Sequence, residues 1–311
     1  MKGYKAFEKG LICKGKQYAE NTVFEEDSAE ICKSGMRFCK NPLDCLDYYP
    51  LIDDNGDLTE FAEVEAIDEP VTDDNKKYSS KKLKIGAKLD LPHFIKTSID
   101  FLIEENAGDN NSGNWARMAS SGNTAQMASA GDFAHMASSG NRARMASSGN
   151  TAQMASAGDW TQIASSGNRA RMASAGDWTQ IASSGNWAHM ASSGNWARMA
   201  SSGNTAQMAS AGDLAQMASS GDFAHMASSG DSAQIASSGR FAVICCTGKD
   251  SIVKAKKGSW ITLSEWKYDD KLKAIIPICV KTEYVDGEKI KEDVFYILKN
   301  GEFEEIKNNT K

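Results

Sequence analysis

Glycine recurs every nine residues through the middle of this 311-residue chain, sixteen times without a slip. The positions are 113, 122, 131, 140, 149, 158, 167, 176, 185, 194, 203, 212, 221, 230, 239 and 248. A fixed short period is typical of a solenoid, in which each repeat packs on its neighbours. The unit cannot be helical, because glycine beside serine and asparagine breaks helices. A nine-residue period also fails to keep equivalent residues on one face of a helix with 3.6 residues per turn. The period therefore predicts stacked strands.

Within the unit, counted from glycine as position one, the residues alternate as they do in a half-buried strand. In the first unit we expect Ala116 and Met118 to face inward while Trp115 and Arg117 face outward. Eleven of the 13 methionines occupy the sixth position, which favours core packing over a metal-binding methionine ladder. The Ala-Ser-Ser-Gly-Asn that follows is expected to turn the corner, with glycine at positive φ. Asn or Asp at the second position either forms a stacked ladder or is a solvent-exposed turn residue.

Nine residues are too few to close a coil, so two or three units must form each turn. With 27 residues per coil, Arg117, Arg144 and Arg171 would stack at about 4.8 Å and repel one another. With 18 residues per coil no two arginines are adjacent, and the thin Ala and Met interior suits two sheets about 10 Å apart. We therefore predict a mainly β fold, a parallel β-solenoid of nine-residue repeats with 18 residues per coil; 27 is the alternative.

The segments on either side of the repeat have ordinary composition. The sequences YKAF, FAEVEAI and KKLKIGAKL predict strands, NPLDCLDYY a short helix and HFIKTSIDFLIEE an amphipathic helix. Near the other end, Asn300-Gly301 predicts a type I′ turn in a β-hairpin. Because open strand edges invite aggregation, we expect both segments to cap the rod. The predicted domains are an α+β N-terminal domain (1–110), the solenoid (111–258) and a small antiparallel β cap (259–311).

Composition limits the setting and the partners. With 41% hydrophobic and 24% charged residues, no apolar run of about 18 residues and no secretion signal, we expect a folded cytoplasmic protein without membrane contact. Seven cysteines spread over a long chain favour reduced thiols. Seven Arg stand against six Asp, with no Lys, between residues 113 and 248, and this balance argues against a nucleic-acid partner.

No recognisable catalytic or cofactor motif occurs in the sequence, so we expect neither an enzyme nor a cofactor. Cys13, Cys32, Cys39 and Cys45 cluster near the N-terminus, but their spacing departs from the two-to-four-residue knuckle of structural zinc sites. We therefore predict no metal, and an enzyme or metal site within residues 1–105 stays as an alternative.

The third and fifth positions carry the outward variation. Aromatic residues beside arginine are enriched in contact surfaces, which favours a binding role. The alternative is a structural role, in which these side chains cover the sheet or pair with the N-terminal domain. The predicted binding residues are Trp115, Arg117, Phe133, Arg144, Trp160, Trp178, Trp187, Trp196, Arg198 and Phe223.

Both ends of the chain carry specific motifs. The opening GYKAFEKGLICKGKQYAENTVFEE, the segment EICKSGMRFCKNPLDCLDYYP and the closing TGKDSIVKAKKGSW and DGEKIKEDVFYILKNGEFEEI flank the Ser-Gly-Asn repeats. In this combination the chain resembles a group of largely uncharacterised phage and prophage proteins of gut-type bacteria. The resemblance implies a phage-derived setting in a host bacterial cell and brings no catalytic residues.

These observations lead to one main hypothesis and two alternatives. The main hypothesis is a non-enzymatic, phage-encoded binding protein whose rod engages a host protein and blocks an antiviral defence. One alternative is a structural, virion-associated or self-assembling rod, which would be a homo-oligomer. The other is an enzyme or metal protein carried by the N-terminal domain.

Overall fold

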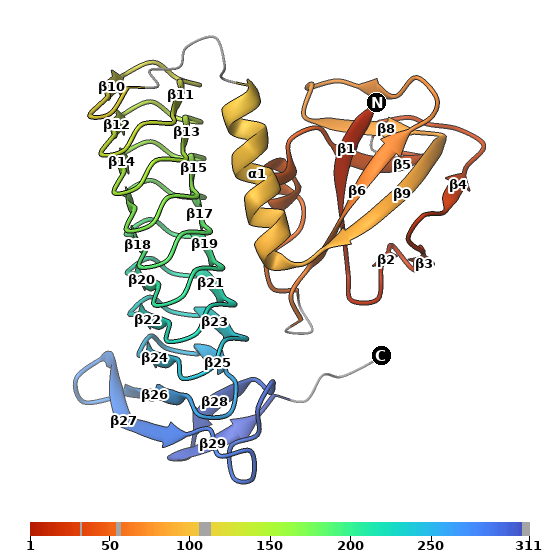
Figure 1. Cartoon of the computed structure of the whole chain (residues 1–311). Coiled ribbons are helices and arrows are strands. Elements are labelled where there is room, and N and C mark those ends of the chain that lie inside the picture. The colour runs from red at the N-terminus through yellow and green to blue at the C-terminus, as the bar shows by residue number, and fades with distance from the viewer. Residues whose placement is uncertain (32, 54–56, 106–112, 307–311) are drawn as a thin grey trace. The chain divides into compact units, whose positions relative to one another are not determined.

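A computed structural model describes residues 1–31, 33–53, 57–105 and 113–306 of the chain (Figure 1). These residues form two compact units, Met1–Phe101 and Leu102–Lys311. The structure is mainly β, and the second unit contains the nine-residue repeats.

Each repeat contributes one strand, of four residues except for the three-residue β25, and alternate strands belong to two different parallel sheets. The first, which we call the β10 sheet, contains β10 (Arg117–Ser120), β12 (His135–Ser138), β14 (Gln153–Ser156), β16 (Arg171–Ser174), β18 (His189–Ser192), β20 (Gln207–Ser210), β22 (His225–Ser228) and β24 (Val243–Cys246). The second, the β11 sheet, contains β11 (Gln126–Ser129), β13 (Arg144–Ser147), β15 (Gln162–Ser165), β17 (Gln180–Ser183), β19 (Arg198–Ser201), β21 (Gln216–Ser219), β23 (Gln234–Ser237) and β25 (Ile252–Lys254).

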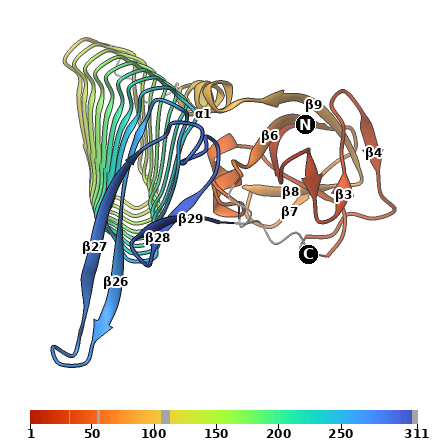
Figure 2. The same cartoon turned by 90° about the horizontal axis from the view of Figure 1, so that it is seen from below.

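Each coil of the solenoid holds two repeats, which confirms the prediction of 18 residues per coil. Arg117 pairs with His135 and Gln126 pairs with Arg144, and the same offset continues along both sheets. Seen along the rod, the flattened coils overlie one another (Figure 2). The 27-residue alternative is therefore wrong, and like-charged arginines do not stack directly on one another.

The interior of the rod is built from three small or flexible side chains per repeat. Alanine or threonine at the fourth position, Met or Ile at the sixth and Ser at the eighth are buried in coil after coil. The eighth-position serine therefore belongs to the strand and points inward, which corrects our expectation that Ala-Ser-Ser-Gly-Asn forms the corner. The turn itself spans the ninth position to the fourth, and the outward fifth position follows it.

The repeat glycine has a different role from the one that we expected. Among the described residues, the glycines from Gly122 to Gly248 do not adopt positive φ; instead, the third-position residue does, with φ of 57 at Trp178 and 60 at Trp187. A Cβ on Gly131, or on any later repeat glycine, would overlap the carbonyl oxygen of the glycine one coil earlier. Glycine is therefore required because successive corner backbones touch, not because of its φ.

The second-position Asn and Asp form a ladder along each corner. The Asn114 side-chain oxygen accepts a hydrogen bond of 3.0 Å from the backbone N–H of Asp132, and Asp132 Oδ1 accepts one of 2.7 Å from Asn150. The same bond repeats in the other corner, from Asn141 N–H to Asn123 Oδ1. The two expectations for this position are therefore both met. These turn residues are largely exposed to solvent, and their side chains also join neighbouring coils.

Because the third-position residue has a left-handed backbone conformation, one substitution there is expected to increase stability. Thr205 has φ of 59, a conformation that is strained for a β-branched residue and tolerated by asparagine. We expect Thr205→Asn to stabilise the rod by about 0.5–1 kcal/mol, measured as a rise in the thermal midpoint followed by circular dichroism. A fall in the midpoint would contradict this assignment of strain.

Antiparallel strands end both sheets at the C-terminal end of the rod. Strand β26 (Trp260–Asp269) pairs in parallel with β24 and then antiparallel with β27 (Ala274–Tyr284). Strands β28 (Tyr296–Lys299) and β29 (Glu302–Glu305) form the hairpin that extends the β11 sheet. The turn residues Asn300 and Gly301 have φ of 52 and 72, as the predicted type I′ turn requires.

The N-terminal unit is an antiparallel sheet with strand order β4-β9-β6-β1-β5-β8-β7. The helical elements are the 3-10 helix η1 (Pro42–Asp47) and α1 (Leu91–Glu105), and Phe94 of α1 stacks on Phe61 of the sheet. The predicted strands and helices are all present. The strands are β1 (Lys2–Phe7), β2 (Ile12–Cys13), β3 (Lys16–Gln17), β4 (Val23–Glu25), β5 (Met36–Cys39), β6 (Glu60–Ala66), β7 (Val71–Thr72), β8 (Lys77–Ser80) and β9 (Lys82–Leu89).

Candidate functional site

The structure divides the ten predicted binding residues between the two corners of the coil and the strands that follow them. We call the turns that lead into the β10 sheet the β10 corner and those that lead into the β11 sheet the β11 corner. The β10 corner and sheet carry Trp115, Arg117, Phe133, Trp187 and Phe223. The β11 corner and sheet carry Arg144, Trp160, Trp178, Trp196 and Arg198.

A stack of three tryptophans runs along the β11 corner. The Trp160 and Trp178 ring centroids are 5.0 Å apart, those of Trp178 and Trp196 are 4.7 Å apart, and both pairs lie within 2° of parallel. The outer two rings are about two-fifths exposed and Trp178 is half-buried. The stack therefore uses much of its ring surface for internal contact, which gives it a structural role whether or not it binds anything.

This stack yields a prediction about stability. Trp178→Ala removes two ring contacts and is expected to lower the free energy of unfolding by about 1–3 kcal/mol. Trp187→Ala is the matched control, because its column neighbours are Arg169 and Thr205 and its φ is similar, and we expect a change within about 0.5 kcal/mol. Chemical denaturation of both variants measures the difference, and equal losses would contradict a stabilising stack.

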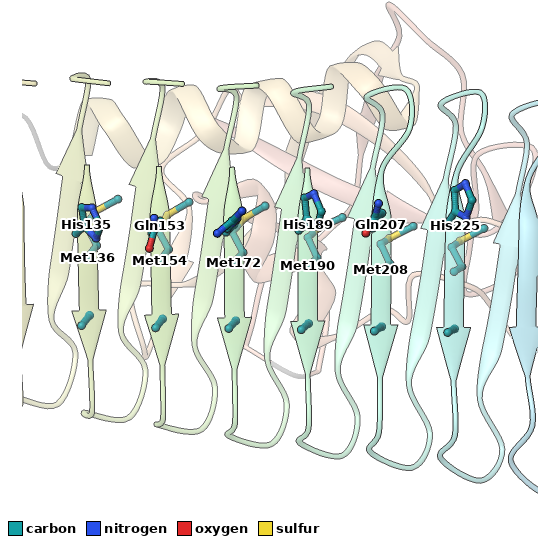
Figure 3. A pocket seen from close by; sticks show the side chains of 18 of the residues that line it. His135, Met136, Gln153, Met154, Met172, His189, Met190, Gln207, Met208 and His225 are labelled. Atoms are coloured by element: carbon teal, nitrogen blue, oxygen red, sulfur yellow. The ribbon is translucent and has the colours of Figure 1, made fainter. Parts of the chain in front are cut away.

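The outer side of the β10 sheet forms an open groove of about 1030 Å³ that runs across eight coils. One wall consists of the fifth-position side chains, of which His135, Gln153, His189, Gln207 and His225 lie in one row along successive strands (Figure 3). The seventh-position alanines form the floor and are exposed, whereas the corresponding alanines of the β11 sheet are buried. The full fifth-position row is Arg117, His135, Gln153, Arg171, His189, Gln207, His225 and Val243.

Aromatic side chains occupy several third positions of the β10 corner, two residues before the fifth-position wall of the groove. The rings of Trp115 and Phe133 stack at 4.4 Å and those of Phe223 and Phe241 at 5.4 Å. Trp187 stands between Arg169 and Thr205 in the column and is 53% exposed. We call this corner together with the groove the β10 face.

The two corners differ in charge. In the second and third positions, the β10 corner has Arg169 and Arg240 against Asp132 and Asp222, and the groove beside it contains Arg117 and Arg171 and no carboxylate in its lining. The Arg240 guanidinium bonds Asp222 at 2.6 Å, which holds the pKa of that carboxyl below its usual range. The β11 corner is acidic in the same positions, with Arg142 and Lys249 against Asp159, Asp177, Asp213, Asp231 and Asp250.

Comparison with known proteins identifies one part of the chain. Residues 1–97 match the family described as a domain of unknown function (DUF7666). Searches of the curated proteins and of the solved structures each return no significant match. The chain is thus a DUF7666 domain followed by the solenoid, and the match does not reach the repeats.

The described cysteines of the DUF7666 domain line one cavity but do not form a metal site. Within the described residues, no group of three or more His, Cys, Asp or Glu side chains is placed to hold a metal ion. Cys13, Cys39 and Cys45 are buried, and a hydrogen bond with Cys45, together with burial, raises the pKa of Cys39. Cys32 lies outside the described residues. In the part of the chain that is described, no helix has both the length and the apolar character of a membrane span.

The sequence reasoning found the outward aromatic residues but missed the groove. His135, His189 and His225 occupy the outward fifth position, and the structure puts them in one row of the groove wall. The available signal was the 18-residue column, which joins these histidines with Gln153 and Gln207 in one sheet. The sequence does not indicate the alanine floor, because alanine at an outward position has no functional group.

Proposed function

We propose that this is a non-enzymatic binding protein whose β10 face engages a host protein. The observation that carries the proposal is the β10 face itself, where exposed aromatic rings on the corner precede, by two residues, the basic and polar wall of an open groove. Stacked coils joined by ladders of backbone hydrogen bonds provide a rigid support for that face.

The chemistry of the face favours a protein partner with an acidic surface. Tryptophan and arginine are over-represented among residues that dominate binding energy, and Trp187 stands two residues from the groove wall. A lining with arginine, histidine and glutamine but no carboxylate complements aspartate and glutamate on a partner. The flat alanine floor allows close approach of a second backbone, because it presents only methyl groups.

The phage setting rests on the resemblance of the end motifs, and from it we propose that the partner belongs to a host antiviral defence. A binding protein that blocks such a component needs a specific surface and no catalytic group. The observed combination of a rigid rod and a chemically distinct face suits that task.

A pair of matched variants tests the proposal. The face variant changes Trp115, Trp187 and Phe223 to Ser, and the stack variant changes Trp160, Trp178 and Trp196 to Ser, so each removes three aromatic rings from third positions. Tagged forms of both and of the original protein are used to capture proteins from host lysate. We expect one protein to be retained by the original and by the stack variant, and lost from the face variant.

Two results would count against the proposal. Retention of the same protein by the face variant would show that the β10 face does not bind it. If sedimentation instead reveals a concentration-dependent oligomer that the face variant abolishes, the face joins copies of this chain rather than a host protein. Thermal midpoints of both variants establish that each has folded before the capture is interpreted.

A further inference from the structure

The DUF7666 domain contains a cavity of about 480 Å³, separate from the β10 face. Its lining comes from β1, the β2–β3 hairpin, β5, η1 and β8. Ligand pockets in proteins commonly have volumes of about 300–1,000 Å³, so the space admits a molecule much larger than a single inorganic ion.

The most informative lining residue is Lys5 on β1, whose exposed fraction is only 4%. Its Nζ donates a 2.9 Å hydrogen bond to the Arg37 carbonyl oxygen and lies 3.4 Å from Cys13 Sγ. The rings of Phe7 and Tyr18 lie 5.4 and 5.6 Å from the same nitrogen. Within the described residues no carboxylate forms an ion pair with this ammonium group. A buried cation without an anionic partner is costly, and a bound anion would remove that cost.

Most of the charged residues around Lys5 are also basic. Five further basic residues line the cavity, and the single lining carboxylate, Glu26, already forms a 2.8 Å ion pair with Lys16. The half-buried guanidinium of Arg37 forms no ion pair with a carboxylate among the described residues. A planar guanidinium can bind phosphate through two parallel hydrogen bonds. The basic lining residues are Lys5, Lys14, Lys16, Lys33, Arg37 and Lys77.

The wall also contains aromatic rings. Tyr4, Tyr48 and Tyr49 line the cavity, and the Tyr49 hydroxyl lies 3.0 Å from Cys13 Sγ. Aromatic side chains commonly stack on nucleobases, while lysine and arginine hold the phosphate. The geometry points to a mononucleotide as the ligand of this cavity, with its phosphate at Lys5 and Arg37 and its base against the tyrosines.

Titration calorimetry on the full chain tests this assignment. The probes are inorganic phosphate, pyrophosphate and a panel of purine and pyrimidine mononucleotides. We expect one mononucleotide to bind clearly more tightly than phosphate alone. Arg37→Gln and Lys5→Met should each weaken that binding about tenfold or more, because each removes a charge-assisted hydrogen bond. Lys84→Gln, on β9 and outside the cavity lining, is the matched loss of one charge and should leave the affinity within about twofold.

Several results would overturn the proposal. One is the absence of binding by every probe at millimolar concentration. Another is undiminished nucleotide binding by Arg37→Gln, a partly exposed site whose variant is expected to fold even if Lys5→Met does not. Equal affinity for phosphate and for all nucleotides would remove the nucleotide assignment. The face variant of the solenoid should bind the nucleotide normally, so failure of this proposal and failure of the proposed function are distinguishable.

Discussion

Gly185→Ala is expected to disrupt the rod at its middle and to lower its stability by about 3 kcal/mol or more. The new Cβ would overlap the carbonyl oxygen of Gly167 in the preceding coil, and backbone cannot move aside as a flexible side chain can. The corner would have to open, which would also strain the hydrogen bond from Asn186 N–H to Asn168 Oδ1. Thermal unfolding by circular dichroism measures the loss, because solenoids need not unfold in one step and a midpoint avoids that assumption.

The repeat provides its own control for this substitution. Gly122 occupies the same position of the unit, but among the described residues a Cβ there would meet only the Ser120 hydroxyl, at 3.7 Å. We therefore expect Gly122→Ala to be nearly neutral. Equal effects at the two sites would mean that glycine is needed for its backbone freedom, and the account of close corner stacking would be wrong.

Met190→Asp is expected to destabilise the rod far more than Ala191→Asp, although the two residues are adjacent. Met190 is 2% exposed and packs in the interior, so a carboxyl group there would lose its hydration without gaining a partner. We expect a cost of about 4 kcal/mol or more, with the aspartate protonated rather than charged. Ala191 is exposed on the groove floor, and its variant should remain within about 1 kcal/mol of the original.

The same thermal measurement decides between these outcomes. A larger fall in thermal midpoint for Ala191→Asp than for Met190→Asp would contradict the assignment of Met190 to the interior and Ala191 to the groove floor. Both variants carry the same new side chain, so the strand propensity of the introduced residue is the same in both.

Much of the rod could be predicted from the repeat, because its geometry depends on period and alternation. Repulsion between Arg117, Arg144 and Arg171 in a 27-residue coil, together with the thin Ala and Met interior, predicted the two repeats per coil that the strand pairing shows. The backbone conformation of the corner was predicted incorrectly, because glycine suggests positive φ and the sequence does not reveal which backbones touch. Trp178 and Thr205 occupy the left-handed position although neither residue prefers it.

The candidate sites were less predictable for a different reason. Counting 18 residues per coil in the sequence puts Trp160, Trp178 and Trp196 in one column, and the stacked rings confirm that column. The open groove beside the charge-balanced β10 corner, by contrast, is seen only in the assembled coil. The cavity of the DUF7666 domain is lined by residues from distant segments, among them Lys5, Arg37 and Lys77. No local sequence pattern therefore predicts it.

The affinity of the captured host protein for the purified chain tests the central proposal most directly. Calorimetric titration of that protein into the original chain, the face variant and the stack variant gives three dissociation constants under identical conditions. We predict that the face variant binds about 100-fold more weakly than the original, as the loss of central aromatic anchors implies, and that the stack variant stays within about threefold. Equal affinities of the original chain and the face variant would contradict the assignment of binding to the β10 face.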